Sequence, residues 1–402
     1  MSKSHKYDWP LGLSTMTWWD KLKISKFLFT EPQWTMGSWV KKYEDVWRKY
    51  TCCPYVVATS SGSTANHLIA LRRKWELEKA GQWTNKNNKV LHPVVNWISS
   101  VSPFVHCGFK PVFADVSDNL CSSIEQITDK LDEDSAITTV FYTTLLGYSC
   151  DLQRLREECE KREVKLLLDN CESSFSKIHI DAGLNQFNID INNFLTSSTS
   201  CYISHFTSGS NELGLIFCQD EEEYWWYIMM RNHGMTRGVP ERYRNLDVDP
   251  LFDFALMGTN FRSSNLLCYL ALLDFERSKD FSLECRRGIS EEFYHYLDGD
   301  KFEKPHIYGI NSVPLAIPVI VKQSCKDKDL FGKVKGYLYS IGVQYRPIVG
   351  GNLLRQTAFE GYGDPKDFPR AEHIHEKGLY LGLNSKITKE MVKELAQELS
   401  KL

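Results

Sequence analysis

From about residue 55, short apolar runs alternate with longer stretches of helical character, and this alternation most constrains the fold. The apolar runs, in chain order, are YVVATSS, KVLHPVV, PVFADV, AITTVFYTTLLG, KLLLDN, NNFLTSSTS and ELGLIFC. Helical stretches such as TANHLIALRRKWELEKA and CDLQRLREECEKREV lie between them. Strands that alternate with helices predict an α/β fold whose mostly parallel sheet is sandwiched by helices. We expect a binding site at the carboxyl ends of these strands.

The pattern changes near residue 275. The helical stretch NLLCYLALLDFERSKDFSLECRRGISEEFYHYL leads there to the apolar runs VPLAIPVIV and GVQYRPIV, and the chain closes with the helical TKEMVKELAQELSKL. We predict an N-terminal segment (1–30), a large domain (31–275) and a smaller C-terminal α+β domain (276–402). The polar run at 77–89 is predicted to be a surface loop.

Charge and cysteine usage exclude several classes of protein. The net charge of −3 means that the chain lacks the excess of basic residues typical of proteins that bind nucleic acid. No apolar run approaches the roughly 18–20 residues that span a bilayer, and the N-terminus lacks the apolar core of a secretory signal. The 12 cysteines are irregularly spaced, with neither a C-x-C nor a C-x-x-C pair. We therefore expect a cytoplasmic, reduced protein that binds neither membrane nor nucleic acid and has no metal site.

Three strand-end features are candidates for chemistry. The segment SSGSTANH, which contains Gly62 and Ser63, precedes a helix, so it predicts either a phosphate site or an ordinary helix cap. Asp169 ends the run KLLLD, where a buried carboxylate needs a partner such as a protonated pyridine nitrogen, unless it caps the next turn. Trp97 could lie flat against an aromatic cofactor or belong to the core.

Taken in order, these features have the layout of a fold-type I pyridoxal phosphate enzyme, and longer blocks make the likeness specific. The blocks TMGSWVKKYEDVWRKY, GFKPVFADV, LLGYSCDLQRLREECEKREVKLLLDNCESS, RNHGMTRG, GTNFRSSN and GVQYRPIVGGNLLRQ occur in succession from about residue 30 onward. They resemble the DegT/DnrJ/EryC1/StrS sugar aminotransferase family. The resemblance implies an aminotransferase-like fold, with the cofactor bound in the large domain.

One block departs from the family pattern. Members normally have Ser-Phe-x-x-x-Lys, whose lysine bonds covalently to pyridoxal phosphate, whereas this chain reads Ser200-Cys201-Tyr202-Ile203-Ser204-His205. A histidine cannot form that bond, so the cofactor must be held non-covalently, as pyridoxal or pyridoxamine 5′-phosphate. Histidine can still move protons near neutral pH.

A histidine in place of this lysine defines one branch of the family, and the chain resembles that branch. Its members are the nucleotide-4-keto-6-deoxyhexose 3-dehydratases of 3,6-dideoxysugar pathways such as that of colitose. The resemblance implies a lyase in which the sugar's C4 ketone condenses with pyridoxamine phosphate, His205 removes a proton from the cofactor's methylene, and the C3 hydroxyl leaves. Branch members with a [2Fe–2S] centre carry a C-x-C pair that is absent here. The chain thus resembles the members that use L-glutamate to regenerate the cofactor, and these act on GDP sugars such as GDP-4-keto-6-deoxymannose.

The family's site residues carry over by position. Gly62, Ser63 and Ser200 are expected at the phosphate, Trp97 on the ring face, Asp169 at the ring nitrogen and Glu172 near the phenolic oxygen. In the family an asparagine of a neighbouring subunit reaches the phosphate, and Asn260 matches it, which implies a homodimer with shared active sites. Arg237 matches an arginine of the family that approaches the substrate or the amino donor. Arg346 is a further candidate for substrate binding, although it could equally form a surface or interface ion pair.

Two alternatives to the dehydratase stay open. The chain could be an aminotransferase that works without the lysine, or an inactive relative that only binds a nucleotide sugar. The segment 206–214 departs from the family pattern, because it is one residue longer than usual, with Leu213 in place of a glycine and Phe206 where a second histidine is common.

Overall fold

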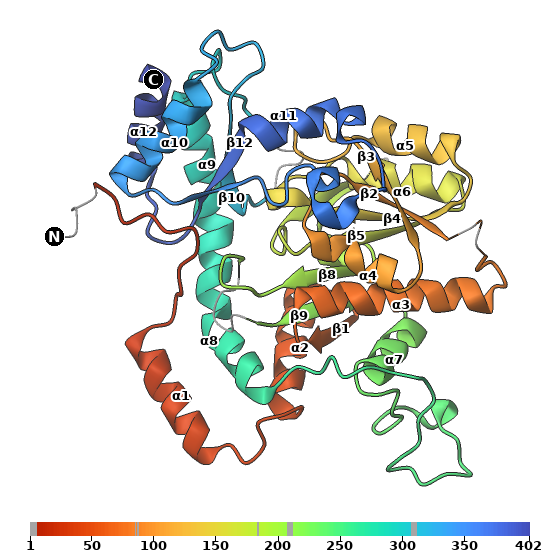
Figure 1. The fold of residues 1–402 in the computed structure, drawn as a ribbon. Coiled ribbons are helices and arrows are strands. Elements are labelled where there is room, and N and C mark those ends of the chain that lie inside the picture. Colours follow the sequence, from red (N-terminus) through yellow and green to blue (C-terminus); the bar gives the residue numbers. More distant parts are fainter. Residues whose placement is uncertain (1–5, 85, 87, 183–184, 207–211, 307–311) are drawn as a thin grey trace.

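The computed structural model describes residues 6–84, 86, 88–182, 185–206, 212–306 and 312–402. Within these residues a seven-stranded sheet forms the centre of the molecule (Figure 1). Its spatial order is β1 (Tyr55–Thr59), β9 (Gly214–Cys218), β8 (Ser197–Ser200), β5 (Lys165–Asp169), β4 (Ile137–Thr143), β2 (Lys89–Pro93) and β3 (Lys110–Ala114). Only β9 runs against its neighbours. The prediction of a mostly parallel sheet is therefore confirmed.

Apolar side chains project from both faces of this sheet, because successive residues of a strand point to opposite sides. Val57 and Ile216 belong to one core, whereas their neighbours Val56 and Phe217 belong to another. The first face is covered by α3 (Gly62–Lys79), α4 (Ser102–His106) and α7 (Glu221–Met230). The second is covered by α2 (Ser38–Thr51), α5 (Ile124–Glu133), α6 (Leu152–Lys161) and α8 (Asn265–Phe281). Helices sandwich the sheet, as predicted.

A second hydrophobic core gathers around a three-stranded sheet near the C-terminus. Its elements are β10 (Ala316–Ile320), β12 (Gly378–Gly382), β11 (Tyr345–Pro347), α9 (Arg287–Tyr296), α10 (Leu330–Ile341) and α12 (Lys389–Lys401), with α11 (Pro369–Lys377) leading into β12. Trp9 of the N-terminal segment is buried in this core, and its indole N–H donates to the Gly382 carbonyl at 2.7 Å. The predicted boundary at residue 275 lies inside α8, which continues through the π-helical turn Ser282–Arg286 into α9.

The sequence patterns missed or misplaced some elements. The prediction of a surface loop over 77–89 is wrong at its start, because α3 continues to Lys79. Leu77 is buried in the core between the sheet and α3, α4 and α7. The antiparallel hairpin of β6 (Lys177–Ala182) and β7 (Asn185–Asp190) was not predicted. Helix α1 (Trp18–Thr30) was not predicted either; Thr17 caps it in a reciprocal box with Asp20. It stands apart from the central sheet in Figure 1.

Candidate active site

A cavity of about 330 Å³ opens where the carboxyl ends of β1, β2, β4, β5 and β8 meet. Parallel strands share one direction, so residues that follow distant strands arrive at the same edge of the sheet. Eight of the residues singled out in the sequence line this cavity: Gly62, Ser63, Trp97, Asp169, Glu172, Ser200, His205 and Arg346.

The N-terminus of α3 forms one wall. Ser61 and Thr64 cap each other in a reciprocal box, which begins the helix at Gly62. The amides of Gly62 and Ser63 lie in the first turn, where a helix offers no internal acceptor, and they are available to an anion. A Cβ on Gly62 would lie 2.8 Å from the Cβ of Ser200 and 3.0 Å from the Cys171 sulfur. Only glycine leaves room there, which fits a close-fitting phosphate cradle.

Asp169 is buried at the end of β5 and is held by donors from three elements. Its carboxylate accepts from Asn66 Nδ2 at 2.9 Å, Ser100 Oγ at 2.6 Å and the Cys171 amide at 3.1 Å. Among the described residues no lysine or arginine pairs with it. A fixed carboxylate without a cation is suited to a protonated ring nitrogen of a ligand.

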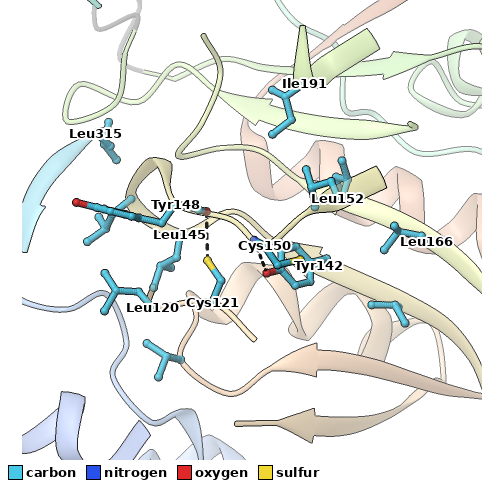
Figure 2. Close-up of a cluster of buried hydrophobic side chains, with 14 of the residues drawn as sticks. Leu120, Cys121, Tyr142, Leu145, Tyr148, Cys150, Leu152, Leu166, Ile191 and Leu315 are labelled. Atoms are coloured by element: carbon cyan, nitrogen blue, oxygen red, sulfur yellow. Dashed lines mark hydrogen bonds between the residues drawn. The ribbon is translucent and has the colours of Figure 1, made fainter. Parts of the chain in front are cut away.

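Glu172 accepts a hydrogen bond from the Leu146 amide at 2.7 Å, and burial raises its pKa to about 7. Leu146 adopts a left-handed conformation, φ 51°. Its neighbours Leu145 and Tyr148 lie in a cluster of buried side chains (Figure 2), and the Tyr148 carbonyl accepts from the Cys121 thiol at 3.2 Å. The hydrophobic core thus fixes the backbone that positions Glu172.

His205 faces the cavity from the segment after β8. Burial lowers the pKa of its imidazole to about 4; a hydrogen bond with the Ser200 backbone and the nearby Asp169 carboxylate oppose this shift only in part, and the charge of Arg286 adds to it. Its Nδ1 is buried and has no hydrogen-bond partner among the described residues. The ring packs edge-to-face with Tyr202, with centroids 5.9 Å apart. His205 is therefore neutral at pH 7 and able to accept a proton.

Arg346 and two tyrosines line the outer part of the cavity. Arg346 on β11 lies opposite Tyr380 on β12 in register, and burial raises the pKa of Tyr380 to about 12. The sequence arguments missed Tyr202 and Tyr380 as lining residues, and they missed the contacts of Asn66 with Asp169. Asn66 lies in the same glycine-containing block as Gly62, which was the one signal that could have indicated it.

Arg237 and Asn260 do not line this cavity. Both are exposed. Arg237 donates to the Leu251 carbonyl at 2.8 Å, and Asn260 accepts from Arg262 Nε at 3.0 Å. The segment that follows α7 projects from the central sheet in Figure 1 and carries exposed apolar side chains: Leu246, Leu251, Phe252, Phe254 and Met257.

The cavity's donors and acceptors fit pyridoxamine phosphate: first-turn amides and a hydroxyl for its phosphate, a carboxylate for its ring nitrogen, and the exposed Trp97 face at the rim. In the described part of the chain no group of three or more His, Cys, Asp or Glu side chains could hold a metal ion. No helix within the described ranges has the length and apolar character to cross a bilayer.

Comparison with known proteins agrees with this geometry. The family model of the DegT/DnrJ/EryC1/StrS aminotransferase family matches residues 26–400. The GDP-4-keto-6-deoxy-D-mannose 3-dehydratase of Escherichia coli O55:H7 is 29% identical over 396 residues, covering 93% of this chain and 95% of that protein.

Two solved structures of GDP-4-keto-6-deoxymannose-3-dehydratase are also similar. One is a histidine-to-asparagine mutant with bound GDP-perosamine, and the other holds a trapped PLP–glutamate geminal diamine. Each has a TM-score of 0.84 and 25% identity and covers 97% of this chain and 99% of the other. The predicted aminotransferase-like fold is confirmed. With a family model that spans nearly its whole length, this chain belongs to the DegT/DnrJ/EryC1/StrS aminotransferase family.

Proposed function

We propose that this protein is a pyridoxamine phosphate-dependent lyase that removes the C3 hydroxyl of a nucleotide-linked 4-keto-6-deoxyhexose, with GDP-4-keto-6-deoxymannose as the favoured substrate. The observation that carries the proposal is His205, which lines the strand-end cavity where family members have a lysine. The product, a 3-deoxy-4-keto sugar, belongs to 3,6-dideoxysugar synthesis for a lipopolysaccharide O-antigen. We place the enzyme in the cytoplasm, in keeping with its twelve free cysteines.

The residues of the cavity that the sequence singled out each have a proposed role, except for His205, which is treated separately below. The Gly62 and Ser63 amides and the Ser200 hydroxyl bind the phosphate, and Trp97 covers one face of the ring. The Asp169 carboxylate pairs with the ring nitrogen, while Glu172 lies at the phenolic oxygen. When bound, pyridoxamine phosphate supplies a primary amine and an electron sink. Arg346 contacts the substrate at the cavity's outer edge.

His205 is proposed as the general base. A neutral imidazole can take the proton from the cofactor's methylene at Nδ1, the atom that has no partner among the described residues. The bound cofactor would supply the electron sink for loss of the C3 hydroxyl, and the protonated His205 would return its proton to that hydroxyl, which leaves as water. Asp169 keeps the ring nitrogen protonated throughout. A second proton transfer by the same imidazole serves the glutamate half-reaction that restores the amine.

The reaction's outcome tests the proposal. Incubation of the enzyme with cofactor, L-glutamate and GDP-4-keto-6-deoxymannose is expected to give a 3-deoxy-4-keto sugar. An amino sugar that keeps its C3 hydroxyl would show instead an aminotransferase without the lysine. A protein that binds the nucleotide sugar but leaves the cofactor's near-ultraviolet spectrum unchanged by glutamate would be a non-catalytic relative.

Two substitutions at position 205 sharpen this test. His205→Asn is expected to reduce dehydration by about 10²–10⁴-fold, because general base catalysis contributes that much. Cofactor binding should stay close to that of the native protein, since His205 is not among the proposed phosphate or ring-nitrogen contacts. His205→Lys restores the family's residue, and we expect a covalently held cofactor and a shift toward transamination.

We also propose a homodimer in which Asn260 reaches the partner's phosphate and Arg237 the partner's substrate. The proposal draws support from the exposure of both residues outside their own cavity, beside the exposed apolar segment 246–257. Coexpression of a His205→Asn chain with an Asn260→Ala chain tests it. A shared site leaves one of the two sites of each heterodimer free of both changes, so heterodimers should regain about half the native activity. Sites built within one subunit would regain none.

A further inference from the structure

The chain before α1 connects the C-terminal three-stranded sheet to the cofactor cavity, and we call its residues 7–13 the N-terminal strap. The Trp9 carbonyl accepts from the Gln344 amide, just before β11, at 2.9 Å. The Gln344 side chain in turn accepts from the Leu11 amide at 3.2 Å. Leu11 then lines the cavity that contains His205. The strap therefore brings an apolar side chain from the start of the chain to the edge of the central sheet.

Two glycines allow the strap to lie in close contact with backbone on both sides. A Cβ on Gly382 of β12 would lie 2.4 Å from the Leu11 carbonyl oxygen. A Cβ on Gly12 would lie 2.7 Å from the Oγ and 3.0 Å from the Cα of Ser204. Backbone atoms cannot swing aside as a flexible side chain can. The strap is therefore held between β12 and the segment that carries His205.

Leu11 also forms part of a wall between two cavities. The cofactor cavity lies on one side of this wall, and a second cavity of about 180 Å³ lies on the other. Leu11, Ser204 and His205 line both cavities. Ser204 and His205 follow β8, whereas Leu11 comes from the strap, so the strap completes the wall. Loss of the Leu11 side chain would join the two cavities beside the imidazole.

Charged groups reach the surroundings of His205 from several elements. Those that line the two cavities are Asp169, Glu172, Glu212, Arg277, Arg286 and Arg346. Burial raises the pKa of the Cys171 thiol and of the Tyr380 phenol in the cofactor cavity, so both are neutral at pH 7. Leu11 adds neither a charge nor a donor to this set. Its contribution is to fill space, and what it displaces from the imidazole is water.

We propose that the N-terminal strap positions the catalytic histidine: Leu11 completes the wall beside the imidazole, and Gly12 sets the backbone that carries His205. Both are positioning residues, because they act through His205. The role of His205 as a base rests on the proposed function, whereas the contacts of the strap do not depend on it. The strap thereby makes the far N-terminus part of the active site.

Single-turnover dehydration by protein preloaded with pyridoxamine phosphate tests the role of Gly12. Gly12→Ala is expected to lower the rate about tenfold, because its Cβ displaces the Ser204 backbone and with it the base. In the His205→Asn background the same change should lower the residual rate less than about twofold, since no imidazole is left to misplace. An equal loss in both backgrounds would overturn the proposal. The control is Leu13→Ala, which changes the same strap where it lines the second cavity alone, and it should keep the native rate.

An NMR titration of the His205 ring in protein without cofactor tests the wall apart from any reaction. In Leu11→Ala the pKa of His205 should rise from about 4 to about 5, because water reaches a ring that burial had desolvated. Leu13→Ala should keep the native value. An unchanged pKa in Leu11→Ala would contradict the proposal, and this variant decides if Gly12→Ala does not fold. Native protein that dehydrates no sugar, in which Leu11→Ala still raises this pKa, would refute the proposed function and leave the role of the strap standing.

Discussion

The pH dependence of the dehydration step offers the most direct test of His205. With a pKa of about 4 the imidazole is about 97% neutral at pH 5.5, whereas an unperturbed histidine, with a pKa near 6.5, would be only about 9% neutral. If neutral His205 is the base, its own titration should change kcat/KM little between pH 8 and pH 5.5. An ordinary histidine would lose about tenfold over the same range.

Glu172 complicates this profile, because its own pKa of about 7 falls inside the range. The assay therefore uses Glu172→Gln, which keeps an acceptor for the Leu146 amide but does not titrate. Steady-state kcat/KM for the nucleotide sugar is measured from pH 5 to pH 8 with preloaded pyridoxamine phosphate. We expect a break near pH 7 in the native enzyme and none in the variant.

The result that would refute the reasoning is an acidic limb near pH 6.5 in Glu172→Gln. It would mean either that the cofactor-loaded cavity does not desolvate His205 or that another group supplies the base. The matching control is His205→Asn in the Glu172→Gln background, whose residual rate should show no limb attributable to an imidazole.

Two further predictions concern stability. His92 is buried with both ring nitrogens unpaired among the described residues, and burial lowers its pKa to about 3. The unfolded chain binds the proton more readily between about pH 6.5 and 3, so the native protein loses stability as the pH falls through that window. Relative to His92→Leu it should lose about 2 kcal/mol between pH 8 and pH 5, measured by urea unfolding; an equal change in both proteins would refute this. Gly62→Ala should cost about 1–3 kcal/mol and weaken cofactor binding, because its Cβ meets Ser200 and Cys171, as seen by thermal melting and cofactor titration. Gly288→Ala, which meets only the flexible end of a lysine, should leave both unchanged or slightly raise the melting temperature.

The sequence could predict the residues at the sheet edge because their positions follow from topology. Asp169 and Ser200 end parallel strands, and Gly62 follows another, so each must arrive at the same side of the molecule. The family resemblance added identities that topology alone left open, such as His205 in place of a lysine. Element type and order were predictable for the same reason, since buried parallel strands appear as short apolar runs.

Contacts that depend on packing could not be predicted. The Asn66–Asp169 and Ser100–Asp169 hydrogen bonds join residues 103 and 69 positions apart, and no local pattern marks them. The β6–β7 hairpin is a different case, because β6 does alternate polar and apolar residues, with Ile178 buried and His179 and Asp181 turned to solvent, and this signal of a half-buried strand was overlooked.

Burial explains how this cavity can work without the family's lysine. It shifts the two titrating groups in opposite directions, lowering the pKa of His205 and raising that of Glu172. His205 is then neutral at pH 7, as the base role proposed for it requires, and Glu172 titrates near that pH beside the proposed position of the phenolic oxygen. A lysine at position 205 would bring a cation that could pair with Asp169 or bond the cofactor. In the proposed mechanism the imidazole does neither, which would leave Asp169 free for the ring nitrogen and the cofactor's amine free for the sugar.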